Sequence, residues 1–520
     1  MAALRQVLSL PDAAGTVGRL GRADDAVEGR FTFLNETREF VEIDWARRYG
    51  NPLWSFNLQY CAYTEDLARA CVATGDPKYS NRLGALIRTW IAQSKPLTAD
   101  AWAPYAIARR LVHWTRAFLL ASDRLDSALS RAWLASIASQ TDFLARTIEW
   151  HLLGNHVVTN LHGVLAGASL LEGRRFEVLA KRAAEKLWRE ARFQVLPDGV
   201  HCERSPMYHA GVMSDLLGAR AVASAMRLPV PAALDKLLPR MADALTFLTR
   251  PDGTYHLFND CANQDPAYVL ELVSLARDGT GGHPVWSASD AGYFGARTTA
   301  LRFIVDCGPL GPDHQPAHGH CDLLSFELDI DGTPVVVDSG TGGYDDDPLR
   351  AYWRSTRAHN TIQVNDLEQH ELWGTFRAAR RARLRHVEYC TSDGPVFTGA
   401  YSPYYSSRVL HTRRIRIWDD GLQVEDSVEG AEGATIRSFV HLHPDVRLEV
   451  SGGHVGLAFK SGFASVDLVN VGRMRVLQGK TGKTQGWHAA QFGVAQAATV
   501  LELHPEDSAA TFGYRITRRG

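Results

Sequence analysis

Hydrophobic periodicity changes once along this 520-residue chain, and the change divides it into two parts. From about Leu53 to Ala276, apolar residues recur three and four positions apart, the spacing of a helix that buries one face. After about Ser287 the pattern becomes short alternating runs between glycine-rich turns, which is typical of an antiparallel sandwich. We therefore predict an α+β multidomain protein, with a helical domain over residues 1–285 and an antiparallel β-sandwich over residues 286–520.

The joints between the predicted helices carry Pro and Gly, the residues that most often interrupt regular structure. The predicted helices are Leu58–Ala73, Tyr79–Ser94, Pro104–Ser122, Leu129–Glu149, Val157–Leu171, Phe176–Phe193 and Met207–Met226. The predicted strands read ALRFIVD, LSFELDI, TPVVVD, NTIQVN, RVLHTRRIRIW, GLQVEDSV and IRSFVHL.

Composition narrows the class of protein. The formal net charge of −2 argues against a nucleic-acid binder. No apolar run reaches the roughly 18 residues that span a bilayer, and the N-terminus does not resemble a signal peptide. The seven scattered cysteines form no CxxC pair, which favours free thiols in a reducing compartment. We expect a cytoplasmic protein, or a periplasmic or secreted one if the sequence given lacks its leader.

The segment from residue 315 to residue 361 places four versatile side chains around a predicted hairpin. Asp331-Gly332 is a tight-turn dipeptide between the runs FELDI and TPVVVD. The candidate ligands or bases are His318, His320, Asp338 and His359. Four such groups near the ends of a rigid hairpin predict a functional site. The alternative is that His320 and His359 are hydrogen-bonded core residues and that Asp338 caps a strand.

Three polar clusters stand out in the helical half. Asn155, His156 and Asn160 lie at the start of an apolar helix, where backbone N–H groups favour an anion, although Asn155 is also a plausible N-cap. The run from Asp198 to His209 places Tyr208 in a first helical turn, with Glu203 just before it.

The third cluster is WAPYAIARRLVHW, residues 102–114. Arg110 and Trp114 are one helical turn apart, an arrangement that suits sugar stacking and carboxylate pairing. A core helix with a snorkelling arginine explains the same spacing.

Together these motifs resemble the heparinase II/III-family polysaccharide lyases over nearly the whole chain. The matching segments, in order, are WAPYAIARRLVHW, GNHVVTN, DGVHCERSPMYH, HGHCDLLSFELDIDGTPVVVDSG, YWRSTRAHNTIQV and ELWGTFRAARRA. The resemblance implies an N-terminal (α/α) toroid followed by a C-terminal antiparallel β-sandwich. It also implies β-elimination at a uronic acid in an anionic polysaccharide.

The resemblance assigns roles residue by residue. The implied catalytic residues are Asn155, His156, Tyr208 and His318. Asn155 and His156 would neutralise the uronate carboxylate, and Tyr208 and His318 would move protons; which of the two is the base stays open. The implied substrate-binding residues are Tyr105, Arg110, Trp114 and Glu203.

The resemblance further implies a zinc ion bound by His320, Asp338 and His359, and no organic cofactor. An ideal turn at Asp331-Gly332 pairs Ser325 with Asp338, which leaves His320 about 16 Å away along the strand. A zinc site therefore requires the chain to bend before Leu323.

Two other functions remain open: a C5-uronosyl epimerase on the same framework, and a non-catalytic carbohydrate-binding protein of exopolysaccharide production. The segment from Glu371 to Arg377 resembles relatives associated with bacterial exopolysaccharides, so the substrate is either a glycosaminoglycan or such a polymer. We expect no nucleic-acid or membrane partner. The sequence leaves the polymer, its linkage and the oligomeric state open.

Overall fold

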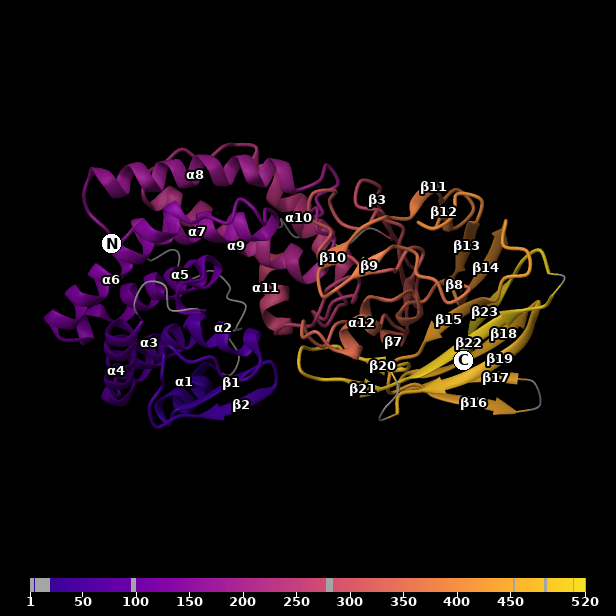
Figure 1. Ribbon diagram of the computed structural model, residues 1–520, viewed down its shortest axis with the longest axis horizontal. Coiled ribbons are helices and arrows are strands. Elements are labelled where there is room, and N and C mark those ends of the chain that lie inside the picture. Colours follow the sequence, from indigo (N-terminus) through magenta and orange to yellow (C-terminus); the bar gives the residue numbers. More distant parts are fainter. Residues whose placement is uncertain are drawn as a thin grey trace. The chain divides into compact units, whose positions relative to one another are not determined.

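The computed structural model describes residue 4 and residues 19–94, 100–276, 284–451, 454–480, 484–507 and 509–519 (Figure 1). The chain divides into two compact units, and each is built from three segments. The first comprises residues 1–195, 210–239 and 264–276, and the second comprises residues 196–209, 240–263 and 277–520. The predicted boundary at residues 285 and 286 does not account for the two earlier segments of the second unit.

The first unit is helical. Its helices are α1 (Arg19–Val27), α2 (Pro52–Tyr60), α3 (Ala62–Thr74), α4 (Pro77–Gln93), α5 (Pro104–Ala121), α6 (Ser127–Arg146), α7 (Gly154–Ala168), α8 (Arg174–Gln194) and α11 (Pro266–Ala276). The chain passes between the units within α9 (Pro206–Ala225) and α10 (Leu234–Leu248). A small antiparallel pair, β1 (Arg30–Phe33) and β2 (Glu36–Glu39), precedes α2.

Extensive helix contacts of the first unit join α3 to α5, α5 to α7, and α7 to α8, so two of these three pairs skip one helix in the sequence. The buried ring of Trp114 on α5 contacts Trp90 of α4 and Trp133 of α6. The helix predicted over Leu58–Ala73 is interrupted. Cys61 adopts a left-handed backbone with φ of 59°, so α2 ends there and α3 begins after it.

The second unit consists of antiparallel sheets (Figure 1). A five-stranded sheet contains β3 (Val285–Ala288), β4 (Tyr293–Arg297), β5 (Leu301–Asp306), β6 (Phe326–Ile330) and β7 (Thr333–Val336). An eight-stranded sheet orders β11 (Arg383–Cys390), β12 (Val396–Ser402), β13 (Leu410–Trp418), β14 (Gly421–Glu429), β23 (Phe512–Arg519), β18 (Gly462–Val469), β17 (His454–Phe459) and β16 (Arg447–Ser451). A four-stranded sheet orders β19 (Val471–Gln478), β22 (Thr499–Pro505), β15 (Ile436–His441) and β8 (Ile362–Val364).

One apolar core joins these sheets. It includes Phe303 and Phe326 from the five-stranded sheet, Ile415 and Val424 from the eight-stranded sheet, and Leu501 from the four-stranded sheet. The predicted strands are therefore observed, and the predicted order of a helical domain followed by an antiparallel β-domain is confirmed.

The predicted hairpin is present with one irregularity. Asp331 and Gly332 both have positive φ, 49° and 73°, as a tight two-residue turn requires. Ile330 pairs with Thr333, but a bulge then shifts the register so that Leu328 faces Val336.

The seven cysteines are free thiols, and six of them are buried. Among the described residues, no helix is both long and apolar enough to cross a membrane.

Candidate active site

Asp260 is fully buried at the centre of a charge cluster in the second unit. One carboxylate oxygen, Oδ2, lies 3.0 Å from Nδ1 of His318, and the other, Oδ1, lies 2.9 Å from Nε2 of His320. The guanidinium of Arg350 donates to both oxygens. One carboxylate therefore fixes two histidines that belong to the same HGH motif.

The backbone around Asp260 explains why these groups meet. Asn259 has φ of 59°, and its side-chain oxygen accepts from the backbone N–H of His320 at 3.1 Å. The backbone N–H of Asp260 donates to the carbonyl of His318 at 3.0 Å, and the Ser205 hydroxyl donates to the carbonyl of Asp260 at 2.6 Å. These bonds hold the start of α9 and the HGH loop against the same short segment.

Tyr208 and His318 are stacked, with ring centroids 4.0 Å apart and 27° between the ring planes. The hydroxyl of Tyr208 lies 2.9 Å from the hydroxyl of Tyr344. Nε2 of His318 lies 3.9 Å from a carboxylate oxygen of Glu203. The structure thus brings together three residues predicted from sequence, Tyr208, His318 and Glu203.

The electrostatics keep Asp260 ionised. Burial opposes its charge, but Arg350 and the bonds from His318 and His320 hold the pKa of Asp260 well below its usual range. An ionised carboxylate only accepts, so Nδ1 of His318 carries the proton of that bond and Nε2 is the atom left for proton transfer. Burial raises the pKa of the Tyr344 hydroxyl well above its usual value.

The predicted zinc ligands lie near one another. The rings of His320 and His359 are 5.3 Å apart, and Nδ1 of His359 lies 2.7 Å from Oδ2 of Asp338. The chain does bend, but across Leu323 and not before it: Ser325 N–H donates to the carbonyl of Asp322 at 2.8 Å, and Leu324 has φ of 65°.

The fit to a metal ion is partial. Nδ1 of His320 and Nε2 of His359 are buried and have no hydrogen-bond partner. The other nitrogen of each ring is held by a carboxylate, an arrangement that is typical of histidines that bind a metal ion. The oxygens of Asp338, however, accept from His359 and from the backbone N–H of Gly340. Within the described ranges, no three His, Cys, Asp or Glu side chains surround one point as ligands.

In the first unit, the α7 cluster lies at the start of its helix, as predicted, and the alternative role of Asn155 as an N-cap is excluded. α7 begins at Gly154 and its N-cap is Leu153, so Asn155 is a buried first-turn residue and not the cap. His156 is held by Glu149, whose Oε2 lies 3.0 Å from Nδ1, and its ring lies 4.8 Å from that of Tyr105. The sequence offered no local signal for Glu149.

Arg110 and Trp114 are core residues, and the prediction that they contact substrate is wrong. Both side chains are 0% exposed. Arg110 donates to the Gln140 side chain at 2.7 Å and to the carbonyls of Gln59 and Ala101 at 2.8 and 2.7 Å. The guanidinium is satisfied inside the helical unit and has no surface left for a sugar.

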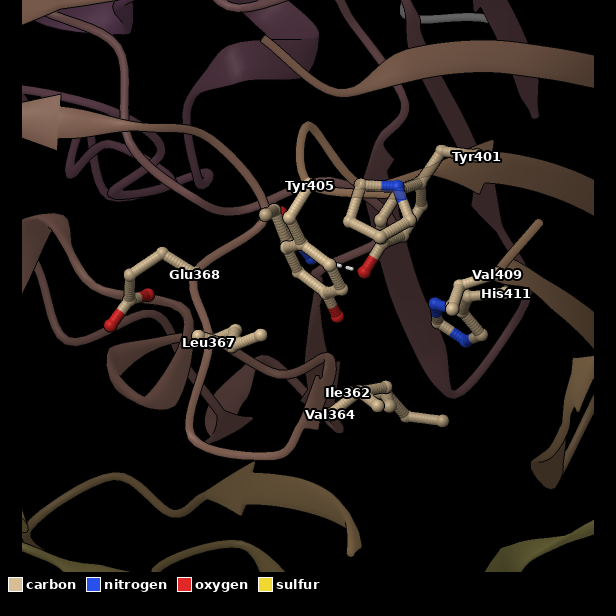
Figure 2. Close-up of a pocket in the computed structure, with 10 residues that line it drawn as sticks. Ile362, Val364, Leu367, Glu368, Tyr401, Tyr405, Val409 and His411 are labelled. Carbon is tan, nitrogen blue, oxygen red and sulfur yellow. Dashed lines mark hydrogen bonds between the residues drawn. The ribbon is translucent and has the colours of Figure 1, made fainter. Parts of the chain in front are cut away.

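Figure 2 shows a separate small pocket in the second unit, lined partly by Ile362, Val364, Tyr405 and Val409. Two of its lining residues are hydrogen-bonded to each other: the side-chain amide of Gln369 donates to the hydroxyl of Tyr401 at 2.9 Å. None of the sequence-predicted site residues lines it.

The chain belongs to the heparinase II/III family. Residues 18–277 match the family description "Heparinase II/III N-terminus" and residues 280–517 match "Heparinase II/III-like, C-terminal". These two matches confirm the family predicted from the motifs.

Two curated proteins are similar to this chain. FtsZ-localized protein C of Caulobacter vibrioides is 25% identical over 414 residues, which cover 73% of this chain and 68% of the relative. Heparin-sulfate lyase of Pedobacter heparinus is 26% identical over 360 residues, 62% of this chain and 53% of the lyase. The match thus spans about half the length of that lyase.

Solved structures share the fold. Heparinase III has a TM-score of 0.77 at 19% identity, over 98% of this chain and 85% of that one. Chondroitin AC lyase of Streptomyces coelicolor A3 has a TM-score of 0.54 at 13% identity, over 99% and 82%. These matches confirm the predicted fold class, and the lyase relatives support the predicted enzyme class, a polysaccharide lyase.

Proposed function

We propose that this chain cleaves a uronic-acid-containing polysaccharide by β-elimination. The observation that carries the proposal is the stacked pair of Tyr208 and His318, two proton-transfer groups fixed by Tyr344 and Asp260. Similarity to heparin-sulfate lyases and to a chondroitin AC lyase supports a glycosaminoglycan, or a comparable anionic exopolysaccharide, as substrate.

The reaction needs two proton transfers. A base removes the proton on C5, the electron pair forms the C4–C5 double bond, the C4–O4 bond breaks, and an acid protonates the departing O4. Nε2 of His318 and the hydroxyl of Tyr208 supply these two roles; which one takes the C5 proton remains open. Asp260 orients His318, and Tyr344 orients the Tyr208 hydroxyl.

Neutralisation of the uronate carboxylate is the other requirement, because the C5 proton is a poor acid. We assign it to Asn155 and His156 of the helical unit, with Glu149 orienting the His156 ring. Donors preorganised for developing charge are each worth about 3–4 kcal/mol. Asn155→Ala is therefore expected to lower kcat about 10²–10³-fold without unfolding the protein.

We also propose that His320, Asp338 and His359 would hold a zinc ion. The two partnerless imidazole nitrogens support this assignment. The ion would supply a fixed positive charge that organises the loop bearing His318. Metal analysis of purified protein should find about one zinc per chain, and it should find none in His359→Ala.

The deciding experiment follows near-ultraviolet absorbance of an unsaturated uronate while the protein is mixed with heparan sulfate, hyaluronan, chondroitin, alginate, glucuronan and bacterial exopolysaccharides. A signal from one polymer that is lost in folded Tyr208→Phe supports the lyase. Exchange of the C5 proton with solvent and no absorbance would instead favour the epimerase. Binding without either signal would favour a non-catalytic carbohydrate-binding protein.

A further inference from the structure

A short hairpin beside the acid–base centre carries exposed aromatic and basic side chains. It consists of β9 (Leu372–Trp373) and β10 (Arg377–Ala378), which pair antiparallel. Trp373 is 51% exposed and Phe376 is 38% exposed. Arg377 is the cross-strand partner of Trp373, and its guanidinium lies 4.5 Å from the centroid of the Trp373 ring.

Buried arginines fix this hairpin in place. Nε and Nη2 of Arg350 donate to the carbonyl of Thr375 at 3.1 and 2.7 Å. Arg354 donates to the carbonyl of Gly374 at 2.9 Å, and both arginines are buried. Because Arg350 also binds Asp260, the same guanidinium holds the hairpin and the carboxylate that orients His318. The hairpin surface is therefore preorganised relative to the acid–base pair.

Ring contacts join the hairpin to the centre directly. The Phe376 centroid lies 6.2 Å from that of His318 and 5.2 Å from that of Tyr344. A polymer unit next to the cleaved one would therefore meet Phe376 and then the exposed pair of Trp373 and Arg377.

The charge of this region suits an anionic chain. Residues 371–388 contain five arginines and two glutamates, a surplus of three positive charges. Arg380 is paired with Glu371, and Arg381 is paired with Asp313. Arg377 is exposed and, among the described residues, has no carboxylate within ion-pair distance.

We propose that Trp373 and Arg377 form a subsite for an anionic sugar unit of the polymer, adjacent to the unit cleaved at Tyr208 and His318. The indole face would stack on the sugar ring, and the guanidinium would pair with its carboxylate or sulfate. This subsite rests on the proposed function, because it takes the same polymer.

The test compares variants of the hairpin pair with variants of a matched pair. Arg515 and Trp418, on β23 and β13, form a similar contact, with the guanidinium 4.3 Å from the ring centroid. Trp373→Ala and Arg377→Gln are set against Trp418→Ala and Arg515→Gln, all in the full chain, with thermal melts to establish folding.

On the polymer that the wild type cleaves, Trp373→Ala should raise KM about tenfold and leave kcat within about twofold. Arg377→Gln should raise KM about fivefold at low salt, and the effect should shrink as ionic strength rises, whereas the Trp373→Ala effect should persist. The control variants should match the wild type. If folded hairpin variants keep the wild-type KM, the subsite is refuted while the lyase proposal stands.

A binding measurement separates the two proposals. Each protein is run through native gels cast with heparan sulfate or with chondroitin sulfate. If the wild type cleaves no polymer but is retarded, and retardation is lost only in the hairpin variants, the subsite is supported and the lyase is not. If no protein is retarded and none cleaves, both proposals fail.

Discussion

Replacing Asp260 by asparagine tests whether the buried carboxylate serves chemistry as well as folding. Asparagine keeps the size of the side chain but removes its charge. The change leaves the Arg350 guanidinium buried without its counter-ion, and it offers the Nδ1 proton of His318 at most a weaker acceptor. Asp260→Asn should therefore lower stability through the unpaired guanidinium of Arg350 and lower kcat through the less firmly held ring of His318.

The two magnitudes follow from these contacts. Breaking one side of a buried ion pair typically costs about 3–5 kcal/mol of unfolding free energy. A positioned acid or base contributes about 10²–10⁴-fold to a rate, and losing the carboxylate that orients a catalytic histidine has cost about 10⁴ in serine proteases. Because an amide oxygen can still accept one bond, we expect kcat to fall about 10²–10³-fold.

Asp426 provides a control in the same unit. It is also fully buried, it accepts two bonds from Arg413 at 2.7 and 2.8 Å, and it lies 2.9 Å from Nε2 of His411. Asp426→Asn should lose a similar unfolding free energy and keep its kcat. Both variants are assayed by uronate absorbance at a temperature at which circular dichroism shows them folded. Equal kcat values for Asp260→Asn and the wild type would refute the assigned role.

Three further predictions concern single contacts. Tyr344→Phe removes the hydroxyl 2.9 Å from that of Tyr208, so kcat should fall about tenfold while the melting temperature changes little; an unchanged kcat would exclude an orienting role. Burial opposes the charge of Asp426, but Arg413 lowers its pKa from 3.8 to about 2, so ionisation of this carboxyl should stabilise the fold by about 2 kcal/mol above about pH 4. The excess unfolding free energy of the wild type over Asp426→Asn, measured by chemical denaturation, should shrink by about this amount as the pH falls towards 2, and a constant difference would contradict the prediction. Arg110→Met should cost about 3 kcal/mol of unfolding free energy and leave KM unchanged, and a raised KM would restore the original substrate assignment.

Local signals predicted the hairpin of the site correctly because its turn is fixed by two adjacent residues. Asp331 and Gly332 both adopt positive φ. The two residue pairs next to the turn, Ile330 with Thr333 and Asp329 with Pro334, have the register that a two-residue turn predicts. The bulge beyond Asp329 was not predictable, since it depends on packing against residues distant in sequence. Its effect is that Val335 and Val336 both join the core.

The residues of the candidate site likewise divide into those that a local motif predicts and those that only the fold brings together. Tyr208 and His318 were found because each stands in a motif, whereas Asp260 stands in the unremarkable run FNDC. Asp260 binds His318 and Arg350, which are 58 and 90 residues away in the sequence, so only the folded chain shows its importance. Arg110 was misassigned because helical spacing places it on a face with Ile107 and Trp114, and spacing alone does not show that the face is entirely buried.

The Asp260 and Asp426 networks differ in where they end, and this difference is the physical case for a reactive site. From Asp426, Arg413 continues to backbone carbonyls, including that of Leu324 at 2.9 Å, so the network closes on the fold itself. From Asp260, His318 continues to the half-buried ring of Tyr208, and Arg350 continues to the exposed hairpin. Two buried carboxylates, each bound to one arginine and to one or two histidines, therefore have different consequences: a charge held at Asp426 acts only on stability, whereas one held at Asp260 also sets the position of groups that a substrate can reach.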